Sequence, residues 1–303
     1  MRAATTITSR IPATAIAFPC GAGALYHGCE DGPAAFRRYL DSHAAPSQWA
    51  QLTWESPPKD PDRGDQTTIE LIAQTNRWLA QTARRLVQRG KFFVVIGGDH
   101  SCAVGAWSGA SEGLREPLGL VWIDAHMDMH VPETTPSGAI NGMALAALLG
   151  HGLSELTALS RRAITPDRIC LVGTRSCELE EVAFAARHGI RVIGMGEISR
   201  RGIEDACGEA RTIADSGTAG YGVSLDLDAF DPADAPGVGT PEQGGIRASE
   251  FLPAWADLTS SPRCVGIEIV EYNPHRDRAE RTARLMSGLV AAAVGEEAEQ
   301  WAL

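Results

Sequence analysis

Two short segments of the chain are apolar at every position: residues 92–96 read FFVVI and residues 118–123 read LGLVWI. A strand with one face in water alternates apolar and polar residues, whereas a strand covered on both faces is apolar throughout. Similar β-rich runs alternate with amphipathic stretches along the chain, as repeated β–α units do. The sequence therefore predicts an α/β fold in which an open parallel sheet carries helices on both faces.

The expected elements follow from the same pattern. The expected strands are Thr14 to Pro19, Phe92 to Ile96, Leu118 to Ile123, Arg168 to Gly173, Ile190 to Met195, Gly220 to Leu225 and Arg263 to Ile269, with a weaker one near Trp49 to Trp54. The clearest expected helices are Thr67 to Arg89, Met143 to Leu149, Glu178 to His188 and Glu280 to Ala292. The segment from Glu55 to Asp65, rich in Pro, Gly and charge, is expected to be a loop.

A chain of 303 residues with 44% hydrophobic content can bury a sizeable core. No internal repeat, low-complexity tract or convincing domain boundary interrupts it. We expect one domain over residues 1–303, with residues 1–13 as a flexible N-terminal extension.

The charge balance argues against several partners. The 27 Lys and Arg residues stand against 38 Asp and Glu residues, for a formal net charge of −11, so nucleic acid is not an expected partner. No apolar run approaches the roughly 20 residues that span a bilayer, and no signal peptide is recognisable. The seven scattered cysteines lack CxxC spacing, so most are expected to be small core residues. We expect a cytoplasmic protein without membrane segments.

Ionisable residues collect where four apolar strands end. They are Asp99 and His100; Asp124, His126 and Asp128; Asp226, Asp228 and Asp231; and Glu268 and Glu271. In an extended chain, residues two apart point to the same side, so Asp124, His126 and Asp128 are expected to converge. Ligands of open α/β sheets bind beyond the carboxyl ends of the strands, which predicts a site there.

Taken singly, some of these residues have ordinary structural explanations. Asp231 precedes a proline and is expected to form a turn, Asp99 to support a neighbouring side chain, and a lone histidine such as His100 to be a satisfied polar residue. Together, however, the carboxylates would repel one another without a cation. The joint pattern therefore favours a metal site.

Charge arithmetic suggests two metal ions. Asp124, Asp128, Asp226 and Asp228 carry about −4 when ionised, which two divalent ions balance. Oxygen-rich ligation with imidazole and no thiolate favours manganese over zinc, with cobalt, nickel and iron left open. Two such ions activate water for attack on an electrophilic carbon, which is hydrolase chemistry.

The motifs GGDHS, DAHMD and SLDLDAFDP resemble the metal-binding signatures of the ureohydrolase family, which includes arginases, agmatinases and formimidoylglutamases. The resemblance extends from residues 28–33 (GCEDGP) through 270–274 (VEYNP). It implies a parallel sheet of about eight strands, a homo-oligomer (trimer or hexamer), two Mn²⁺ ions per chain and a small guanidino substrate.

The resemblance also implies roles for the strand-end residues. It implies that the ligands of one ion are His100, Asp124, Asp128 and Asp228, and that those of the other are Asp124, His126, Asp226 and Asp228. By the same resemblance Glu271 holds the guanidinium group, and Asp128 is a catalytic residue.

The segment from Val131 to Gly150 is closest to the arginase branch, because VPETTPSG and GMALAALLG resemble arginase segments. The resemblance implies that Thr135 and Ser137 bind the substrate α-carboxylate, and that Glu178 and Glu181 bind the α-amino group. Without it, these two glutamates would be interpreted as a solvated helix face.

Three positions depart from the arginase pattern. Asn141 replaces a histidine that shuttles protons, and Ala139 replaces an asparagine that binds the carboxylate, while His130 stands where Asn is common. An amide cannot titrate near neutral pH. Proton transfer therefore passes to His130 or Asp128, and His130 can also donate a hydrogen bond to the carboxylate. The alternative is that His130 merely caps the loop.

The leading hypothesis is an amidinohydrolase acting on arginine or a close analogue. N-hydroxyarginine, guanidinobutyrate and agmatine stay open as substrates. A different class, motivated by Asn141, is a catalytically impaired homologue that keeps its metal site.

Overall fold

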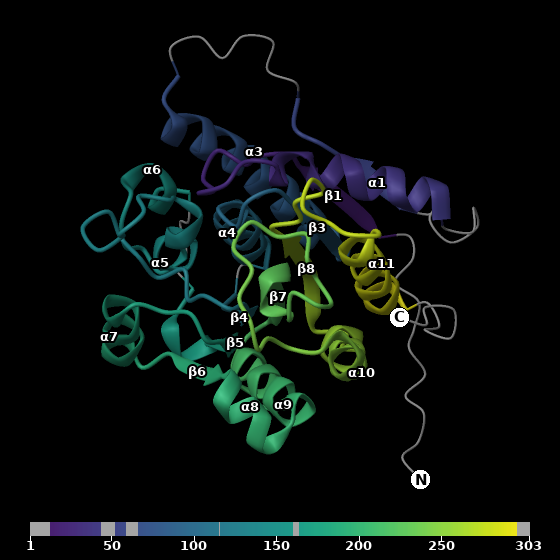
Figure 1. Cartoon of the computed structure of the whole chain (residues 1–303). Helices are drawn as coiled ribbons and strands as arrows, with labels where there is room; N and C mark the ends of the chain where they lie inside the picture. The colour runs from purple at the N-terminus through teal and green to yellow at the C-terminus, as the bar shows by residue number, and fades with distance from the viewer. Residues whose placement is uncertain (1–12, 44–51, 59–65, 115, 160–163, 296–303) are drawn as a thin grey trace.

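The computed structural model describes residues 13–43, 52–58, 66–114, 116–159 and 164–295. Its centre is one eight-stranded sheet in the order β2-β1-β3-β8-β7-β4-β5-β6, and the paired strands are all parallel (Figure 1). The strands are β1 (Thr14–Phe18), β2 (Thr53–Glu55), β3 (Phe93–Gly97), β4 (Leu118–Ile123), β5 (Ile169–Thr174), β6 (Arg191–Gly194), β7 (Gly220–Asp226) and β8 (Cys264–Val270).

The open parallel sheet predicted from the sequence is confirmed. Strands β3 and β4, which arise from the two uninterrupted apolar runs, are buried at every residue. The weaker expected strand near Trp49 to Trp54 corresponds to β2, although residues 44–51 lie outside the described part of the chain. The expected loop from Glu55 to Asp65 begins at the end of that strand, and residues 59–65 also lie outside it.

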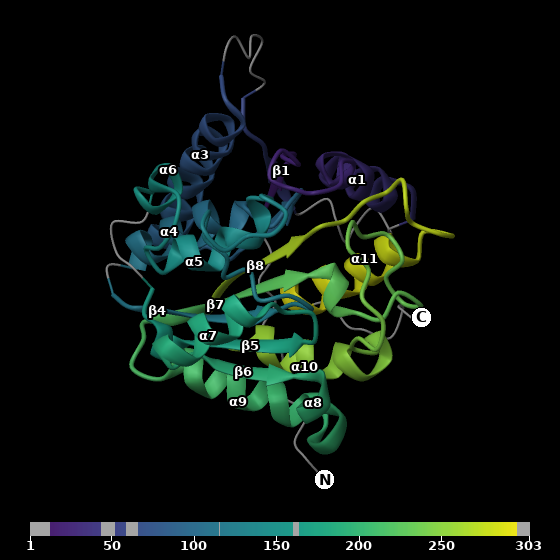
Figure 2. The same ribbon diagram turned by 60° about the vertical axis from the view of Figure 1, so that its left-hand side comes forward.

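Helices cover both faces of the sheet (Figure 2). One buried apolar cluster contains side chains from α3 (Thr68–Gln88), α4 (Cys102–Leu114), α5 (Ala144–Leu148), α6 (Ser154–Thr157) and α7 (Leu179–His188). The other contains side chains from α1 (Gly32–His43), α8 (Met195–Arg201), α9 (Ile203–Asp215), α10 (Ala248–Ser260) and α11 (Arg281–Val294). The four expected helices correspond to α3, α5, α7 and α11.

Residues 1–12 of the expected N-terminal extension lie outside the described residues, and Ala13 is buried. Among the described helices, none has the length and apolar character needed to cross a membrane. No disulfide joins the seven cysteines, all of which lie in the described part of the chain, and every one except Cys177 is buried, which confirms that most are core residues.

The topology brings distant segments of the sequence to one edge of the sheet. Strands β3, β8, β7 and β4 are neighbours in that order, so their carboxyl ends and the loops that follow lie together. The register pairs Val95 with Glu268 and Ser224 with Glu268, which places these three positions side by side across the sheet. The ionisable residues after the four strands therefore meet at this edge.

Candidate metal centre and active site

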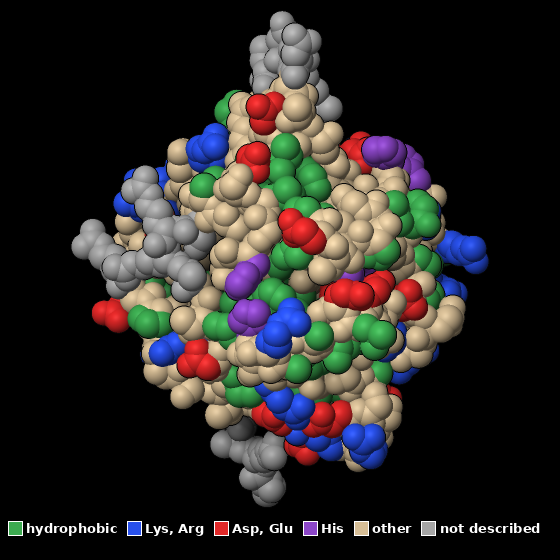
Figure 3. Space-filling model, turned by 90° about the vertical axis from the view of Figure 1, so that its left-hand side faces the viewer, with side chains coloured by type: hydrophobic (Ala, Val, Ile, Leu, Met, Phe, Trp, Pro, Cys, Tyr) green, Lys and Arg blue, Asp and Glu red, His purple; other side chains and the backbone are tan. Residues whose placement is uncertain are grey.

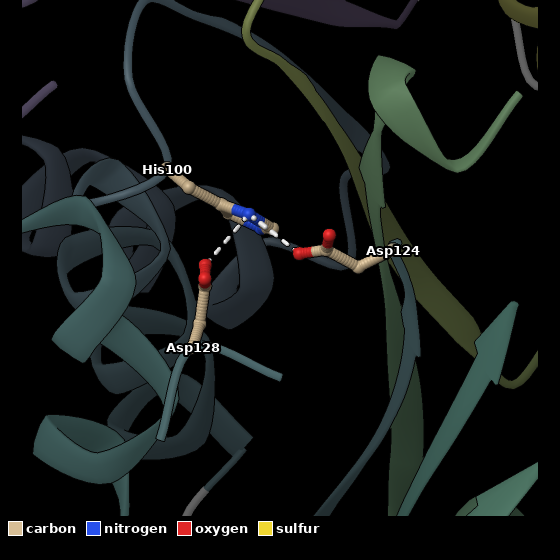
Figure 4. A group of neighbouring side chains, drawn as sticks. All are labelled: His100, Asp124 and Asp128. Carbon is tan, nitrogen blue, oxygen red and sulfur yellow. Dashed lines mark ion pairs between the residues drawn. The ribbon is translucent and has the colours of Figure 1, made fainter. Parts of the chain in front are cut away.

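The first group of potential metal ligands surrounds His100, which follows β3. Its Nδ1 atom lies 3.2 Å from Asp124 Oδ2, 3.1 Å from Asp128 Oδ2 and 3.3 Å from Asp226 Oδ2. Figure 4 shows the carboxylates of Asp124 and Asp128 approaching the ring from two sides. This nitrogen is buried and has no hydrogen-bond partner. A buried nitrogen facing carboxylate oxygens in this way matches the donor set of a bound cation.

The second group surrounds His126 and shares Asp124 with the first. His126 Nδ1 lies 3.1 Å from Asp228 Oδ2 and 3.5 Å from Asp124 Oδ1. Asp226 therefore lies against His100 and Asp228 against His126, whereas the resemblance implied Asp228 as a ligand beside His100. All six predicted metal-ligand residues nevertheless come together.

The backbone conformation that brings the candidate metal ligands together differs from the extended chain that was expected. Strand β4 ends at Ile123, and Asp128 has a left-handed backbone with φ of 53°. Asp226 ends β7, whereas Asp228 lies in the 3₁₀ helix Leu227–Ala229. The expectation that extended alternation brings these residues together was wrong, because turns beyond the strand ends do so.

Burial and mutual repulsion act on the carboxylates. Burial and the charge of Asp124 raise the pKa of Asp128 to about 6, and burial with the charge of Asp228 raises the pKa of Asp226. Burial acts to raise the pKa of Asp124 as well, but contacts with His100 and His126 hold it below the ordinary value. The four carboxylates outnumber the two imidazoles in the cluster, and divalent ions fit its residues.

Buried side chains behind the ligands hold them in place. His100 Nε2 lies 2.8 Å from Ser224 Oγ, whose hydroxyl donates to Glu268 at 2.7 Å. The Trp122 ring stacks on His100, and its indole N–H donates to Asp124 Oδ2 at 3.0 Å. Orientation of a metal-binding imidazole through its other nitrogen is a common feature of metal sites.

Glu268 was expected among the strand-end residues that form the site, but the structure gives it a supporting position. Its side chain is fully buried and also accepts hydrogen bonds from the Trp107 indole and the Cys102 thiol. Asp99 accepts from the backbone N–H groups of Gly23 and Ser101, and so supports the loops that contain these residues. Asp231 accepts from backbone N–H groups and forms the expected turn.

Arg175 is a further contributor that sequence reasoning missed. Its guanidinium donates to backbone carbonyls in the loops that carry the ligands, namely those of Gly173, Asp228, Ala229, Phe230, Glu242 and Gln243. One side chain therefore joins the end of β5 to the loop after β7. The planar guanidinium, with five fixed donors, suits this task.

Glu271 follows β8 with a left-handed backbone, φ 66°, and its carboxylate is buried. Its Oε1 atom accepts from the His100 backbone N–H at 2.9 Å and from the Asn141 side-chain amide at 3.0 Å. Burial, followed by the charge of Asp99, raises its pKa to about 8. The structure thus brings Glu271 and Asn141, which were named separately from the sequence, into contact beside the cluster of candidate metal ligands.

His130, Glu178 and Glu181 form a third group whose potential ligand atoms lie within 4.8 Å of one another. His130 Nε2 lies 3.2 Å from Glu178 Oε2 and 3.7 Å from Glu181 Oε2. Glu181 is buried, and burial raises its pKa to about 8, whereas Glu178 is half exposed. A solvated helix face, the interpretation that ignores the family resemblance, therefore does not describe Glu181.

The loop that follows His130 contains Thr135 and Ser137. Thr135 is partly buried, and Ser137 is exposed. Their hydroxyls accept from the backbone N–H groups of Gly138 and Ala139, respectively. The loop ends at Asn141, whose backbone N–H donates a hydrogen bond to the carbonyl of Gly23. Ser176, which follows β5, donates a hydrogen bond to the side chain of Glu242.

Comparison with known proteins agrees with this geometry. The model of the arginase family matches residues 12–295. The arginase of Bacillus caldovelox is 35% identical over 296 residues, covering 94% of this chain and 99% of the relative, and the arginase of Bacillus subtilis is 37% identical over 231 residues, covering 76% and 77%.

Solved structures give the same result. The native structure of the Bacillus caldovelox arginase has a TM-score of 0.85 at 34% identity, covering 95% of this chain and 99% of that one. A Bacillus subtilis formimidoylglutamase shares the fold, with a TM-score of 0.75 at 21% identity. The ureohydrolase resemblance is confirmed, and the chain belongs to the arginase family.

Proposed function

We propose that this protein is a dimanganese amidinohydrolase that cleaves the guanidino group of L-arginine or a close analogue. The products are urea, or a substituted urea, and ornithine, and the enzyme works in the cytoplasm as a homo-oligomer, a trimer or hexamer. The observation that carries the proposal is that two groups of potential metal ligands, one around His100 and one around His126, share Asp124. Beside them, Glu271 accepts a hydrogen bond from the backbone N–H of His100.

In the proposed site, His100, Asp124, Asp128 and Asp226 would hold one ion, and Asp124, His126 and Asp228 would hold the other. Bound manganese supplies Lewis acidity and lowers the pKa of water near the guanidino carbon. Oxygen-rich ligation with imidazole supports manganese.

The remaining residues orient the substrate. Glu271 receives the guanidinium group, and the Asn141 amide fixes the position of its carboxylate. Asn141 cannot titrate, so proton delivery to the departing amine is assigned to Asp128 or His130. The contact of His130 with Glu178 supports a role in binding the amino-acid head, together with Glu181, Thr135 and Ser137.

Substrate preference tests this proposal. We expect kcat/KM for L-arginine to exceed that for agmatine by at least about 100-fold, because agmatine leaves the donors for the carboxylate unpaired. The measurement is urea release from L-arginine and agmatine, and release of the corresponding products from N-hydroxyarginine and 4-guanidinobutyrate, under identical manganese loading. A clear preference for agmatine or guanidinobutyrate would refute the proposal that the site recognises an α-amino acid group. It would leave the proposed metal chemistry unaffected.

The impaired-homologue alternative rests on Asn141, and Asn141→His tests it. If the wild type already moves protons through other groups, the substitution is expected to change kcat by less than about 10-fold. A positioned acid or base contributes roughly 100-fold or more. A rise of that size in the variant would therefore identify the wild-type chain as catalytically impaired.

A further inference from the structure

The group formed by His130, Glu178 and Glu181 has the same spacing as the two groups at the metal centre. Its imidazole-to-carboxylate distances are 3.2 and 3.7 Å, compared with 3.1 to 3.3 Å around His100 and 3.1 to 3.5 Å around His126. The donors come from the loop after β4 and from the start of α7, so the fold itself brings them together. This similarity raises the question of whether the third group also binds a cation.

Hydrogen bonds fix the orientation of the His130 ring. Nδ1 lies 3.1 Å from Thr134 Oγ1, and the Thr134 hydroxyl donates to the carbonyl of Val131. Because the hydroxyl proton is used there, its oxygen accepts the Nδ1–H of His130. Nε2 is therefore the ring nitrogen that faces the two glutamates, and it is the atom through which His130 would bind a cation.

Glu181 is fixed in a similar way. Its Oε1 atom accepts from the backbone N–H of Met129 at 3.0 Å, and its Oε2 atom accepts from the backbone N–H of Glu178 at 3.2 Å and lies 3.7 Å from His130 Nε2. Only 7% of His130 and 2% of Glu181 is exposed. Within the described part of the chain, Glu178 and Glu181 form ion pairs with His130 and with no Lys or Arg. Two carboxylates and one imidazole nitrogen therefore converge here, and no Lys or Arg pairs with the carboxylates within the described residues.

The donors indicate which cation would bind. One imidazole nitrogen and two carboxylate oxygens, with no thiolate, suit a borderline divalent ion, and Zn²⁺ accepts such a set while keeping an open coordination position. Half of the Glu178 side chain is exposed, so the ion can exchange with solvent. The face that carries α5 to α7 displays histidine and acidic side chains among hydrophobic ones (Figure 3).

We propose that His130, Glu178 and Glu181 form a third cation site, separate from the dinuclear centre, that takes a divalent ion such as Zn²⁺. The same glutamates are assigned to the α-ammonium group of the substrate, so the ion competes with that group and regulates the enzyme. This regulatory consequence rests on the proposed function, whereas binding of the ion rests on the geometry of the three side chains.

Binding of zinc to the manganese-loaded protein tests the site without substrate. Equilibrium dialysis followed by elemental analysis is expected to find one tightly bound zinc per chain while manganese is retained. His130→Asn and Glu181→Gln are expected to weaken zinc binding by at least about 10-fold. His188→Asn is the matched control, because this histidine lies at the far end of α7 and outside the group, and it is expected to bind zinc like the wild type.

Circular dichroism and the manganese content of each variant confirm that the fold and the dinuclear centre are kept. Zinc bound equally by the wild type and both cluster variants would overturn the proposal, as would zinc that only displaces manganese, or no uptake of zinc. These outcomes are independent of urea release from L-arginine. If the protein hydrolyses L-arginine but binds no zinc beside its manganese, only the third cation site is overturned. If it binds that zinc but does not hydrolyse L-arginine, only the proposed function is overturned.

Discussion

Asp226→Ala is expected to release bound manganese and to lower turnover by at least about 1,000-fold. The substitution removes a buried carboxylate that lies against His100 at the centre of the ligand cluster. Loss of a Lewis acid costs several kcal/mol of transition-state stabilisation, and about 4 kcal/mol corresponds to three orders of magnitude in rate. Elemental analysis of the manganese-loaded variant and urea release under the same conditions measure the two effects together.

Asp257→Ala is the control for this experiment, because it removes an exposed carboxylate that pairs with Arg211 on the surface. It is expected to leave manganese content and turnover unchanged. His126→Ala is expected to act like Asp226→Ala. Wild-type activity in either ligand variant, or full activity in the presence of a chelator, would return the cluster to a purely structural role.

His130→Ala is expected to lower kcat/KM by about 100- to 10,000-fold, the range for a positioned acid or base. The substitution removes the imidazole that the loop offers in place of the histidine missing at Asn141. It also leaves Glu178 and Glu181 without their ion-pair partner. Steady-state kinetics with L-arginine, with His188→Ala as the control, measure the change.

The separate values of kcat and KM assign the role of His130. A proton donor acts on kcat, whereas a group that binds the amino-acid head acts mainly on KM. The contact with Glu178 predicts that KM rises. If kcat stays at the wild-type value, His130 is not the proton donor, and Asp128 becomes the assigned group.

The sheet could be predicted because a strand that is buried on both faces is apolar at every position in the sequence. Strands such as β3 and β4 are apolar at every position, so their existence and approximate bounds follow from composition alone. The gathering of charged residues at the strand ends could also be predicted, because histidine and aspartate are costly at the end of a buried strand unless they bind something. The assignment of six of them as candidate metal ligands came from the family resemblance.

The path of the backbone between the ligands could not be predicted. The left-handed conformation of Asp128 depends on the loop packed around it, and no local sequence rule requires it at an aspartate. The supporting residues were missed for a related reason. Ser224 and Arg175 are ordinary polar residues in sequence, and only the pairing of β7 with β8 and the closure of the loop after β7 give them their partners.

The hydrogen bonds of Glu271 restrict how a guanidinium can dock. Its Oε1 atom already accepts from the His100 backbone and from Asn141, so Oε2 is the oxygen left for a ligand. A side-on, two-pronged carboxylate–guanidinium pair needs both oxygens to be free. We therefore expect Glu271 to bind the substrate guanidinium through Oε2 alone. A guanidino nitrogen that does not contact Glu271 can then carry a substituent.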